Sequence, residues 1–350
     1  MSNRNLTILA VVAAVVLAWA IVQSRLSNRR TVKTLETGPL IQGLETAAID
    51  RIQLGTGPES VVLKRQDQGF VITDKDNYPA QTRTINELIA NCLEIQTAEL
   101  VTHSPSNHED LEVTEEKARY LVKFFDAENQ LITGVVVGKY ADQGSGSYVR
   151  QVNSDEVYLA ESSPYLQTQV LSYIDSRLIE VDQDEITQVQ ITIDQDDYIL
   201  LQEPNETIVL APTETETPPK LKQSVARQVY TALSSLYLTD VQKASPETAE
   251  LDFNATYQCR LKDSTVYILQ IATSEDKYYL KCRALFTDQT PVTIDRTKVD
   301  SEEMLQEKEA KLLARQAAQE FTARHQNWVY EIAAWKAENL TQNLSDLIEQ

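Results

Sequence analysis

The glycine-rich stretch GKYADQGSGSYVR, residues 138–150, is the segment whose residue types and spacing come closest to a site for chemistry. It holds three of the nine glycines of the chain and follows an apolar run, as a phosphate-binding loop does. Such a loop leads into a helix, because the first amides of the helix and its positive end bind the anion. The residues after Gly146 instead have the pattern of a strand. We therefore predict a hairpin in which Gly144 and Gly146 adopt positive φ angles.

The other residues that could bind a metal or transfer a proton are scattered. His103 and His108 share a polar loop, and His325 ends a predicted helix, without further ligands at the spacing of a metal site. The acidic run 193–198 (IDQDDY) lacks the glycine and the distal glutamate of a calcium loop, so we predict an acidic hairpin turn. No phosphate-loop, nucleophile-elbow or zinc-protease motif occurs. We expect no catalytic residue, no cofactor and no metal.

The first long apolar run, residues 6–22 (LTILAVVAAVVLAWAIV), lies between Arg4 and Arg25. Seventeen helical residues span about 26 Å, close to the thickness of a hydrocarbon core of about 30 Å. We predict an uncleaved transmembrane anchor over residues 1–24. Two alternatives stay open: a signal peptide cleaved after the small residues Ala18 and Ala20, and a buried soluble helix. The anchor residues that we single out are Leu6, Val15, Trp19 and Val22.

The charge of the chain fits a membrane-anchored body. The net charge of −20 argues against a nucleic-acid partner, because phosphates would be repelled by most of the surface. Residues 1–33 hold five basic groups and no acidic one, so the rest of the chain is strongly acidic. The three cysteines are too few for a disulfide framework, although one bridge between Cys259 and Cys282 stays open.

The order of predicted elements divides the body into two related units. A polar linker over residues 25–45 is followed by an α+β unit over 46–178 and a second one over 179–350. In each unit strands precede a helix, over 82–101 and over 221–238, and more strands follow; a short helix ends the unit, over about 164–174 in the first and up to Ile348 in the second. Similar segments recur: IDRIQL and ITQVQI, and RYLVKFFD and TYQCRLKD, lie 137 residues apart, and EVYLA and WVYEI lie 172 apart because the second unit contains an insertion. We therefore predict an α+β fold of mostly antiparallel sheet with packed helices, after the transmembrane helix.

The second unit contains an additional long helix near the carboxyl terminus. Residues 300–326 begin with a residue that can cap a helix, continue with Glu302 and Glu303, and are rich in strong helix formers. Two interpretations are open: a helix packed lightly on its own unit, and a helix that binds a partner. The residues proposed for a partner are Leu305, Leu312, Leu313 and Phe321.

Several short motifs resemble the bacterial family known as domain of unknown function 4340. They comprise Tyr78 with Pro79 before a helix, a "GV" step at 111–113, a "vGk" strand end at 137–139, a "yVR" strand at 148–150, a "VYl" strand at 157–159 and a "DrrLl" segment at 175–179. The resemblance covers residues 46–200 well and the second unit weakly. Glu112 stands where the family usually has glycine, and Phe70 where it often has tryptophan.

The resemblance implies one amino-terminal anchor and an extracytoplasmic, periplasmic body, in a family often encoded beside gliding-type ABC transporter components. The basic residues alone favour the opposite orientation, because only Arg4 precedes the apolar run and four basic groups follow it. The expected function is an accessory or scaffold protein, without catalysis, held in the bilayer by its first helix and bound to a membrane complex such as an ABC transporter. The alternative is an extracytoplasmic solute-binding protein or carboxylate-dependent hydrolase with a pocket between the units, where acids and Tyr148, Tyr278 and Tyr279 converge.

Overall fold

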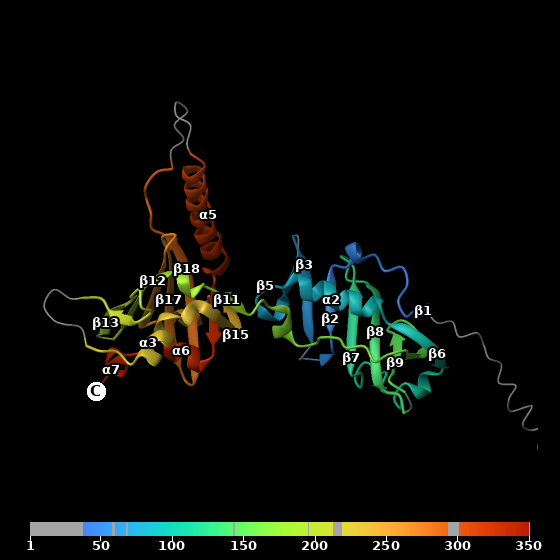
Figure 1. Ribbon diagram of the computed structural model, residues 1–350. Helices are drawn as coiled ribbons and strands as arrows, with labels where there is room; N and C mark the ends of the chain where they lie inside the picture. Colours follow the sequence, from blue (N-terminus) through green and yellow to red (C-terminus); the bar gives the residue numbers. More distant parts are fainter. Residues whose placement is uncertain are drawn as a thin grey trace, which may run out of the picture. The chain divides into compact units, whose positions relative to one another are not determined.

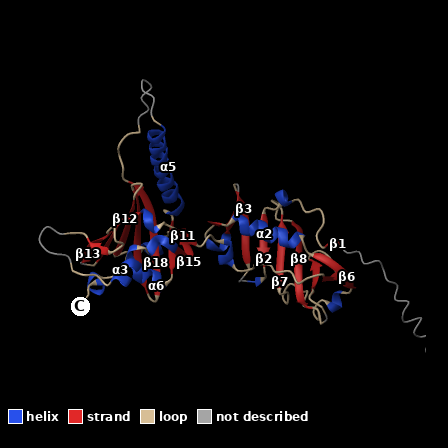
Figure 2. Ribbon diagram, viewed as in Figure 1, coloured by secondary structure: helices blue, strands red, loops and turns tan. Residues whose placement is uncertain are grey.

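The computed structural model describes residues 38–57, 60–67, 69–142, 144–194, 196–212, 219–292 and 301–349. Strands dominate it, and helices are few (Figures 1 and 2). By their contacts the described residues form two compact units. The first unit holds the residues up to Ser60 together with Asn86–Thr168, and the second holds Val61–Ile85 together with the residues from Gln169 onward. The predicted boundaries at residues 46, 178 and 179 stay predictions.

The first sheet is antiparallel and has the strand order β1-β6-β10-β9-β8-β7-β2-β3-β4-β5 in the described residues. Its strands are β1 (Gly38–Pro39), β2 (Arg51–Leu54), β3 (Val61–Gln66), β4 (Gly69–Ile72), β5 (Tyr78–Pro79), β6 (Gln96–Thr102), β7 (Tyr120–Phe125), β8 (Leu131–Tyr140), β9 (Ser147–Gln151) and β10 (Val157–Ala160). Helix α2 (Thr82–Leu93) buries Ile85, Leu88, Ile89 and Cys92, as their helical spacing predicts.

The second sheet is also antiparallel, with the order β11-β15-β19-β18-β17-β16-β12-β13-β14. Its strands are β11 (Arg177–Ile179), β12 (Ile186–Ile193), β13 (Asp196–Gln202), β14 (Ile208–Leu210), β15 (Leu236–Lys243), β16 (Ala255–Leu261), β17 (Thr265–Ser274), β18 (Lys277–Phe286) and β19 (Trp328–Ile332). The helices are α3 (Gln223–Tyr230), α4 (Pro246–Ala249), α5 (Glu302–His325), α6 (Ala334–Leu340) and α7 (Leu344–Leu347). Without β5, the strands of the first sheet follow the same order as those of the second.

The α+β class with two mostly antiparallel sheets is confirmed, and so is the long helix. Helix α5 begins after Ser301, whose side chain accepts a hydrogen bond from the backbone N–H of Met304 at 3.3 Å. The acidic residues of its first turn and the basic residues of its last turn complement the helix dipole. The acidic hairpin predicted at 193–198 joins β12 to β13.

Four predicted helices are shorter or broken in the structure. The helical pattern read through 82–101 ends at Leu93, and β6 follows; β15 likewise follows α3 and a short 3₁₀ turn. These strands contain residues that also suit helices, and pairing with β10 and β19 decides their conformation. The helix predicted over 164–174 is a 3₁₀ turn at Val170–Tyr173, and the closing helix is split into α6 and α7.

The glycine-rich stretch forms the hairpin between β8 and β9, as predicted, but its two glycines serve different purposes. Gly144 has a φ angle of +94° and open space around the position of a Cβ atom. Gly146 does not have positive φ; instead a Cβ atom there would lie 2.1 Å from the carbonyl oxygen of Ala160. The expectation of positive φ at both glycines was therefore wrong for Gly146, where the close approach of the chain after β10 requires glycine.

The bridge left open between Cys259 and Cys282 is excluded. Cys259 lies on β16 and Cys282 on β18, with β17 between them. Strands two apart are separated by about 9.5 Å, which exceeds the Cα separation of a disulfide. Both thiols are free, and burial raises the pKa of each to about 12.

The predicted anchor, with Leu6, Val15, Trp19 and Val22, and the linker up to residue 37 lie outside the described residues. Among the helices that are described, none is long and apolar enough to span a bilayer.

Candidate functional site

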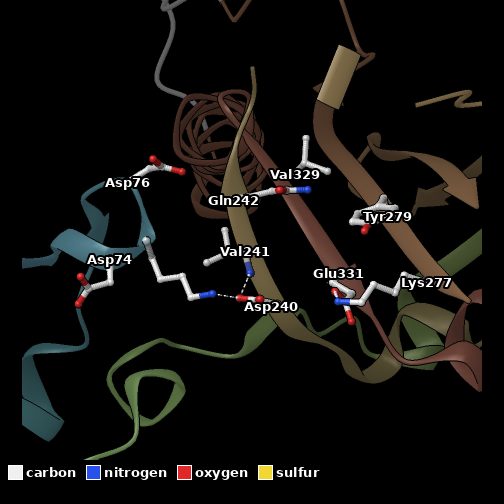
Figure 3. A pocket seen from close by; sticks show the side chains of 10 residues that line it. Asp74, Asp76, Asp240, Val241, Gln242, Lys277, Tyr279, Val329 and Glu331 are labelled. Atoms are coloured by element: carbon white, nitrogen blue, oxygen red, sulfur yellow. Dashed lines mark hydrogen bonds and ion pairs between the residues drawn. The ribbon is translucent and has the colours of Figure 1, made fainter. Parts of the chain in front are cut away.

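A cavity of about 210 Å³ in the second unit gathers the charged side chains that could do chemistry (Figure 3). The turn between β4 and β5 supplies one wall, and β15, β18 and β19 supply the others. Its lining residues are Asp74, Lys75, Asp76, Asp240, Val241, Gln242, Lys277, Tyr279, Val329 and Glu331. Four of these residues are acidic and two are lysines.

Each lysine of the cavity is already paired. Nζ of Lys75 donates to a carboxylate oxygen of Asp240 at 2.6 Å, and that oxygen also accepts from the backbone N–H of Val241 at 2.7 Å. Nζ of Lys277 lies 2.7 Å from the carboxylate of Glu331. The hydrogen bond that Lys277 donates to Glu331 raises the pKa of Lys277. Figure 3 shows Asp240, Glu331 and Lys277 on the neighbouring strands β15, β19 and β18.

The two remaining carboxylates accept hydrogen bonds from backbone N–H groups. Asp74 accepts from the N–H of Val62 at 3.1 Å, and Asp76 accepts from the N–H of Lys243 at 3.2 Å. Each of the four carboxylates of the cavity thus accepts a hydrogen bond from an ammonium or a backbone N–H group. The arrangement is suited to polar contacts and to holding the turn at 73–76 in place.

Two of the tyrosines that were expected to converge, Tyr278 and Tyr279, lie on opposite faces of one strand. Tyr279 lines the cavity, whereas its neighbour Tyr278 belongs to the opposite face of β18, because successive side chains of a strand alternate. Tyr148 lies on β9 in the first unit, where it packs against a core cluster that contains Val136 and Val157. Lys75 and Asp240 are 165 residues apart, and no sequence signal joins them.

Helix α5 places three of its four predicted partner-binding residues in solvent. Leu305, Leu312 and Leu313 are 52%, 51% and 58% exposed. Phe321 instead packs on its own unit, with its ring 5.1 Å from that of Tyr267 and 4.4 Å from that of His325. The carboxyl-terminal half of α5 is therefore held by the sheet, while the amino-terminal half presents leucines outward.

A buried aromatic network holds the end of α5. Nδ1 of His325 lies 2.6 Å from the hydroxyl of Tyr330 on β19, and Tyr330 shares a hydrogen bond with Tyr78 on β5. The ring of Tyr78 also contacts that of Trp328 edge to face, at 4.8 Å. His325 is 6% exposed, and burial, with a smaller effect of Arg324, lowers its pKa to about 4.

The buried histidine predicts that the second unit loses stability in mild acid. An unfolded histidine takes up its proton near pH 6.5, whereas folded His325 does so only near pH 4. Between these values the unfolded state binds more protons, so the free energy of unfolding falls as the pH decreases. We expect a loss of about 2 kcal/mol between pH 7 and pH 5. Urea unfolding followed by the fluorescence of Trp328 and Trp335, the tryptophans of this unit, measures it.

The variant His325→Gln is expected to lose this pH dependence, because glutamine does not titrate. His103→Gln is the matched control: its side chain is 63% exposed and contacts Glu156 at 3.3 Å, so the dependence should persist. If His325→Gln and the native chain show the same change from pH 7 to pH 5, the assignment to His325 is wrong.

The remaining histidines do not form a metal site. His103 is exposed, but His108, which was expected on the surface with it, is 7% exposed, and its Nε2 lies 3.0 Å from the carbonyl oxygen of Asp155. Among the described residues there is no group of three or more His, Cys, Asp or Glu side chains that could hold a metal.

Three of the sequence motifs, at 111–113, 137–139 and 148–150, meet in the first unit. Their residues Glu112, Gly138 and Arg150 form one structural node. Glu112 has a φ angle of 56°, the left-handed region in which glycine carries no steric penalty. Gly138 packs against this turn, because a Cβ atom there would lie 2.2 Å from the carbonyl oxygen of Leu111. A glycine at both positions therefore has a geometric reason, and Glu112 replaces one of them at a cost in strain.

The arginine of the "yVR" motif ties the same node together. Arg150 is 8% exposed, and its Nε donates to the carbonyl oxygen of Val113 at 2.7 Å. Its Nη1 donates to the carbonyl oxygens of Gln151, Val152 and Ser154 at 3.0, 3.1 and 3.2 Å. Burial lowers its pKa. Arg150 thus holds backbone turns together, and Gly138 allows one of them to approach.

Comparison with known proteins gives one match. Neither a curated protein nor a solved structure is similar to the sequence. The model of one family, described as a domain of unknown function (DUF4340), matches residues 71–255, which is more than half of the chain. This range contains the Glu112, Gly138 and Arg150 node and the helix and strands around it. The chain therefore belongs to the family of domain of unknown function 4340.

Proposed function

We propose that the protein is a membrane-anchored accessory or scaffold protein with an extracytoplasmic body that binds a membrane complex of the transporter type. The observation that carries the proposal is the division of α5 into a held half and an exposed half. The predicted amino-terminal anchor would keep the body at the membrane surface, within reach of such a complex. Catalysis is not part of the proposal.

The exposed half of α5 has the properties of a helix that binds a groove. Four large apolar side chains are exposed on its first three turns: Met304, Leu305, Leu312 and Leu313. Leu305 and Leu312 are seven residues apart and lie on one side of the helix, a common spacing of helix anchors in a groove. In Figure 1 this half of α5 extends past the strands of its own sheet.

The other half of α5 is rigidly attached, which a presenting helix requires. Thr322 donates its hydroxyl proton to the carbonyl oxygen of Ala284 at 2.8 Å and accepts from the N–H of the same residue at 2.9 Å. In the half that carries the leucines, Nζ of Lys311 also pairs with Asp288 at 2.6 Å. A rigid helix loses little conformational freedom on binding, so its exposed leucines can contribute fully to affinity.

We also propose that the chain arose by duplication of one unit, so that two related sheets form the scaffold. The support is the shared strand order, in which nine strands of each sheet occupy corresponding places. The recurring segments IDRIQL and ITQVQI are β2 and β12, and they occupy equivalent places in that order. A scaffold that carries α5 in one unit alone would present its partner-binding helix once per chain.

The alternative, a solute-binding protein or hydrolase, has less support. The cavity of Figure 3 has its lysines paired with carboxylates and its remaining carboxylates bound to backbone N–H groups. A solute would have to compete with these contacts. The leucines Leu305, Leu312 and Leu313 of α5 are more than half exposed.

Photocrosslinking in native membranes tests the proposal. A benzoylphenylalanine at position 312 is expected to capture a transmembrane protein, identified by mass spectrometry. The same group at position 203, exposed in the turn between β13 and β14, is the control and should capture little. The triple variant Leu305→Ser, Leu312→Ser, Leu313→Ser should lose copurification of that protein by tenfold or more, with an unchanged fold because the three side chains are exposed.

Three outcomes would contradict the proposal. Position 312 could capture no transmembrane protein, positions 312 and 203 could capture the same proteins equally, or the triple serine variant could retain its partner. Protease digestion of intact cells tests the orientation separately: the body should be cut from outside once the outer barrier is opened, and cutting only after lysis would place it in the cytoplasm.

A further inference from the structure

In the first unit, the glycine-rich hairpin between β8 and β9 places an exposed tyrosine over an arginine. Tyr140 ends β8 and is 61% exposed. The guanidinium carbon of Arg119, just before β7, lies 3.9 Å from the centre of its ring and 5.1 Å from that of Tyr120. A third ring, that of Tyr165, lies 6.1 Å from Tyr120 and is 66% exposed. Arg119 thus contacts two tyrosine rings, and a third ring packs against one of these.

One nitrogen of the Arg119 guanidinium, Nη2, is held by a hydrogen bond within the protein. Its Nη2 donates to the hydroxyl of Ser163 at 2.7 Å, and that hydroxyl lies 2.8 Å from the hydroxyl of Ser147. Ser147 is fully buried at the start of β9, so this short chain of hydroxyls is anchored in the sheet. The arginine is therefore held in one position by hydrogen bonds and by ring contacts.

The rest of the guanidinium has no acceptor within the described residues. Nε and Nη1 are buried and make no hydrogen bond, and no carboxylate forms an ion pair with Arg119 there. An arginine stays protonated in proteins, and buried N–H groups without an acceptor cost free energy. An acceptor from outside the chain would remove that cost.

The residues around Arg119 indicate which kind of hydrogen-bond acceptor would bind there. The cluster supplies one positive charge and neutral hydroxyls, which match a monoanion better than a phosphate dianion. A planar carboxylate fits the planar donors of a guanidinium. The exposed rings of Tyr140 and Tyr165 offer faces on which a ring of the ligand can stack. Tyr140 is exposed enough to rotate aside and uncover the donors.

We propose that Arg119, with Tyr120, Tyr140 and Tyr165, forms a binding site for a ring compound that carries a carboxylate. The carboxylate accepts from Nε or Nη1 of Arg119, which lie on different edges of the guanidinium, and the ring lies against the tyrosines. The site belongs to the first unit and is independent of α5, so it can be tested without the partner of that helix.

Ligand-observed NMR on the full chain tests the site with three probes. Benzoate is expected to bind with a millimolar dissociation constant, benzamide at least tenfold more weakly because it lacks the charge, and inorganic phosphate at least tenfold more weakly because it lacks the ring. Arg119→Gln is expected to weaken benzoate binding tenfold or more. Arg119→Lys, which keeps the charge without the planar donors, should weaken it about fivefold. Arg283→Gln, at an exposed position of β18, is the matched control and should leave binding unchanged.

The proposal is overturned by any of three results: benzoate gives no signal, benzamide or phosphate binds as tightly as benzoate, or Arg119→Gln and Arg119→Lys both bind benzoate like the native chain. Circular dichroism of both Arg119 variants shows whether they fold. If Arg119→Gln does not fold, a fivefold loss in folded Arg119→Lys supports the site and an unchanged affinity overturns it.

Discussion

Replacing Arg150 with methionine is expected to lower the stability of the first unit by about 3 kcal/mol or more. Methionine has a similar length and fills much of the same volume, but it donates no hydrogen bond. The carbonyl oxygens of Val113, Gln151, Val152 and Ser154 would lose the donor that the guanidinium supplies. Val113 is fully buried, so water would not replace that donor there without opening the structure.

Hydrogen exchange measured by mass spectrometry gives the most direct readout of this variant. Faster exchange is expected in the peptides around residues 108–118 and 147–155, which Arg150 joins, and urea unfolding followed by circular dichroism gives the overall loss. Arg283→Met, at an exposed position, is the control and should stay within about 0.5 kcal/mol of the native chain. A change of less than 1 kcal/mol for Arg150→Met would show that the four carbonyl groups do not depend on the arginine.

The second large effect is expected at Gly146. Alanine there would place Cβ 2.1 Å from the carbonyl oxygen of Ala160 and 3.0 Å from Cδ1 of Leu159, so the chain after β10 must move away from β9. We expect a loss of about 3 kcal/mol, the upper part of the range for overpacking, because a backbone atom has to shift. Nearby Gly144 has open space, so alanine there should cost only about 1–2 kcal/mol for its positive φ.

Comparing Gly146→Ala with Gly144→Ala separates two reasons for a glycine: the lack of space for a Cβ atom and a positive φ angle. Thermal and urea unfolding of both variants measure the difference, and hydrogen exchange in residues 157–161 should accelerate in Gly146→Ala alone. Equal losses in the two variants, or a larger loss in Gly144→Ala, would mean that the close approach to Ala160 does not control this hairpin. The distinction matters because the hairpin carries Tyr140 over Arg119.

Local patterns were enough to predict much of the fold. The alternation in β12 and β16, the apolar face of α2 and the cap and charges of α5 appear in short windows of sequence, and the structure confirms these elements. The exposure of Leu305, Leu312 and Leu313 was likewise foreseeable from their sparse spacing in a polar helix. These features depend on the rotation per residue of a helix or strand and on the helix dipole, so neighbouring residues suffice to predict them.

The charged cavity and the arginine cluster could not be predicted in the same way. Lys75 and Asp240 meet because β4, β5 and β15 are placed by the packing of the second unit, and the pair has no spacing that a sequence motif could record. Arg119, Tyr140 and Ser163 come from three different segments of the first unit. The sequence contains one hint of the arginine cluster: the glycine-rich hairpin lies next to Tyr140.

The sequence by itself determined the two sheets, the helices with clear periodicity and the acidic, three-cysteine composition of the chain, because each depends on local propensity or on counts. Only the tertiary structure decided where α2 gives way to β6, which glycine is needed for space, and which arginine lacks an acceptor. These features depend on backbone and side chains that approach from distant segments. At Gly146, the carbonyl group of Ala160 decides what a residue 14 positions earlier can be.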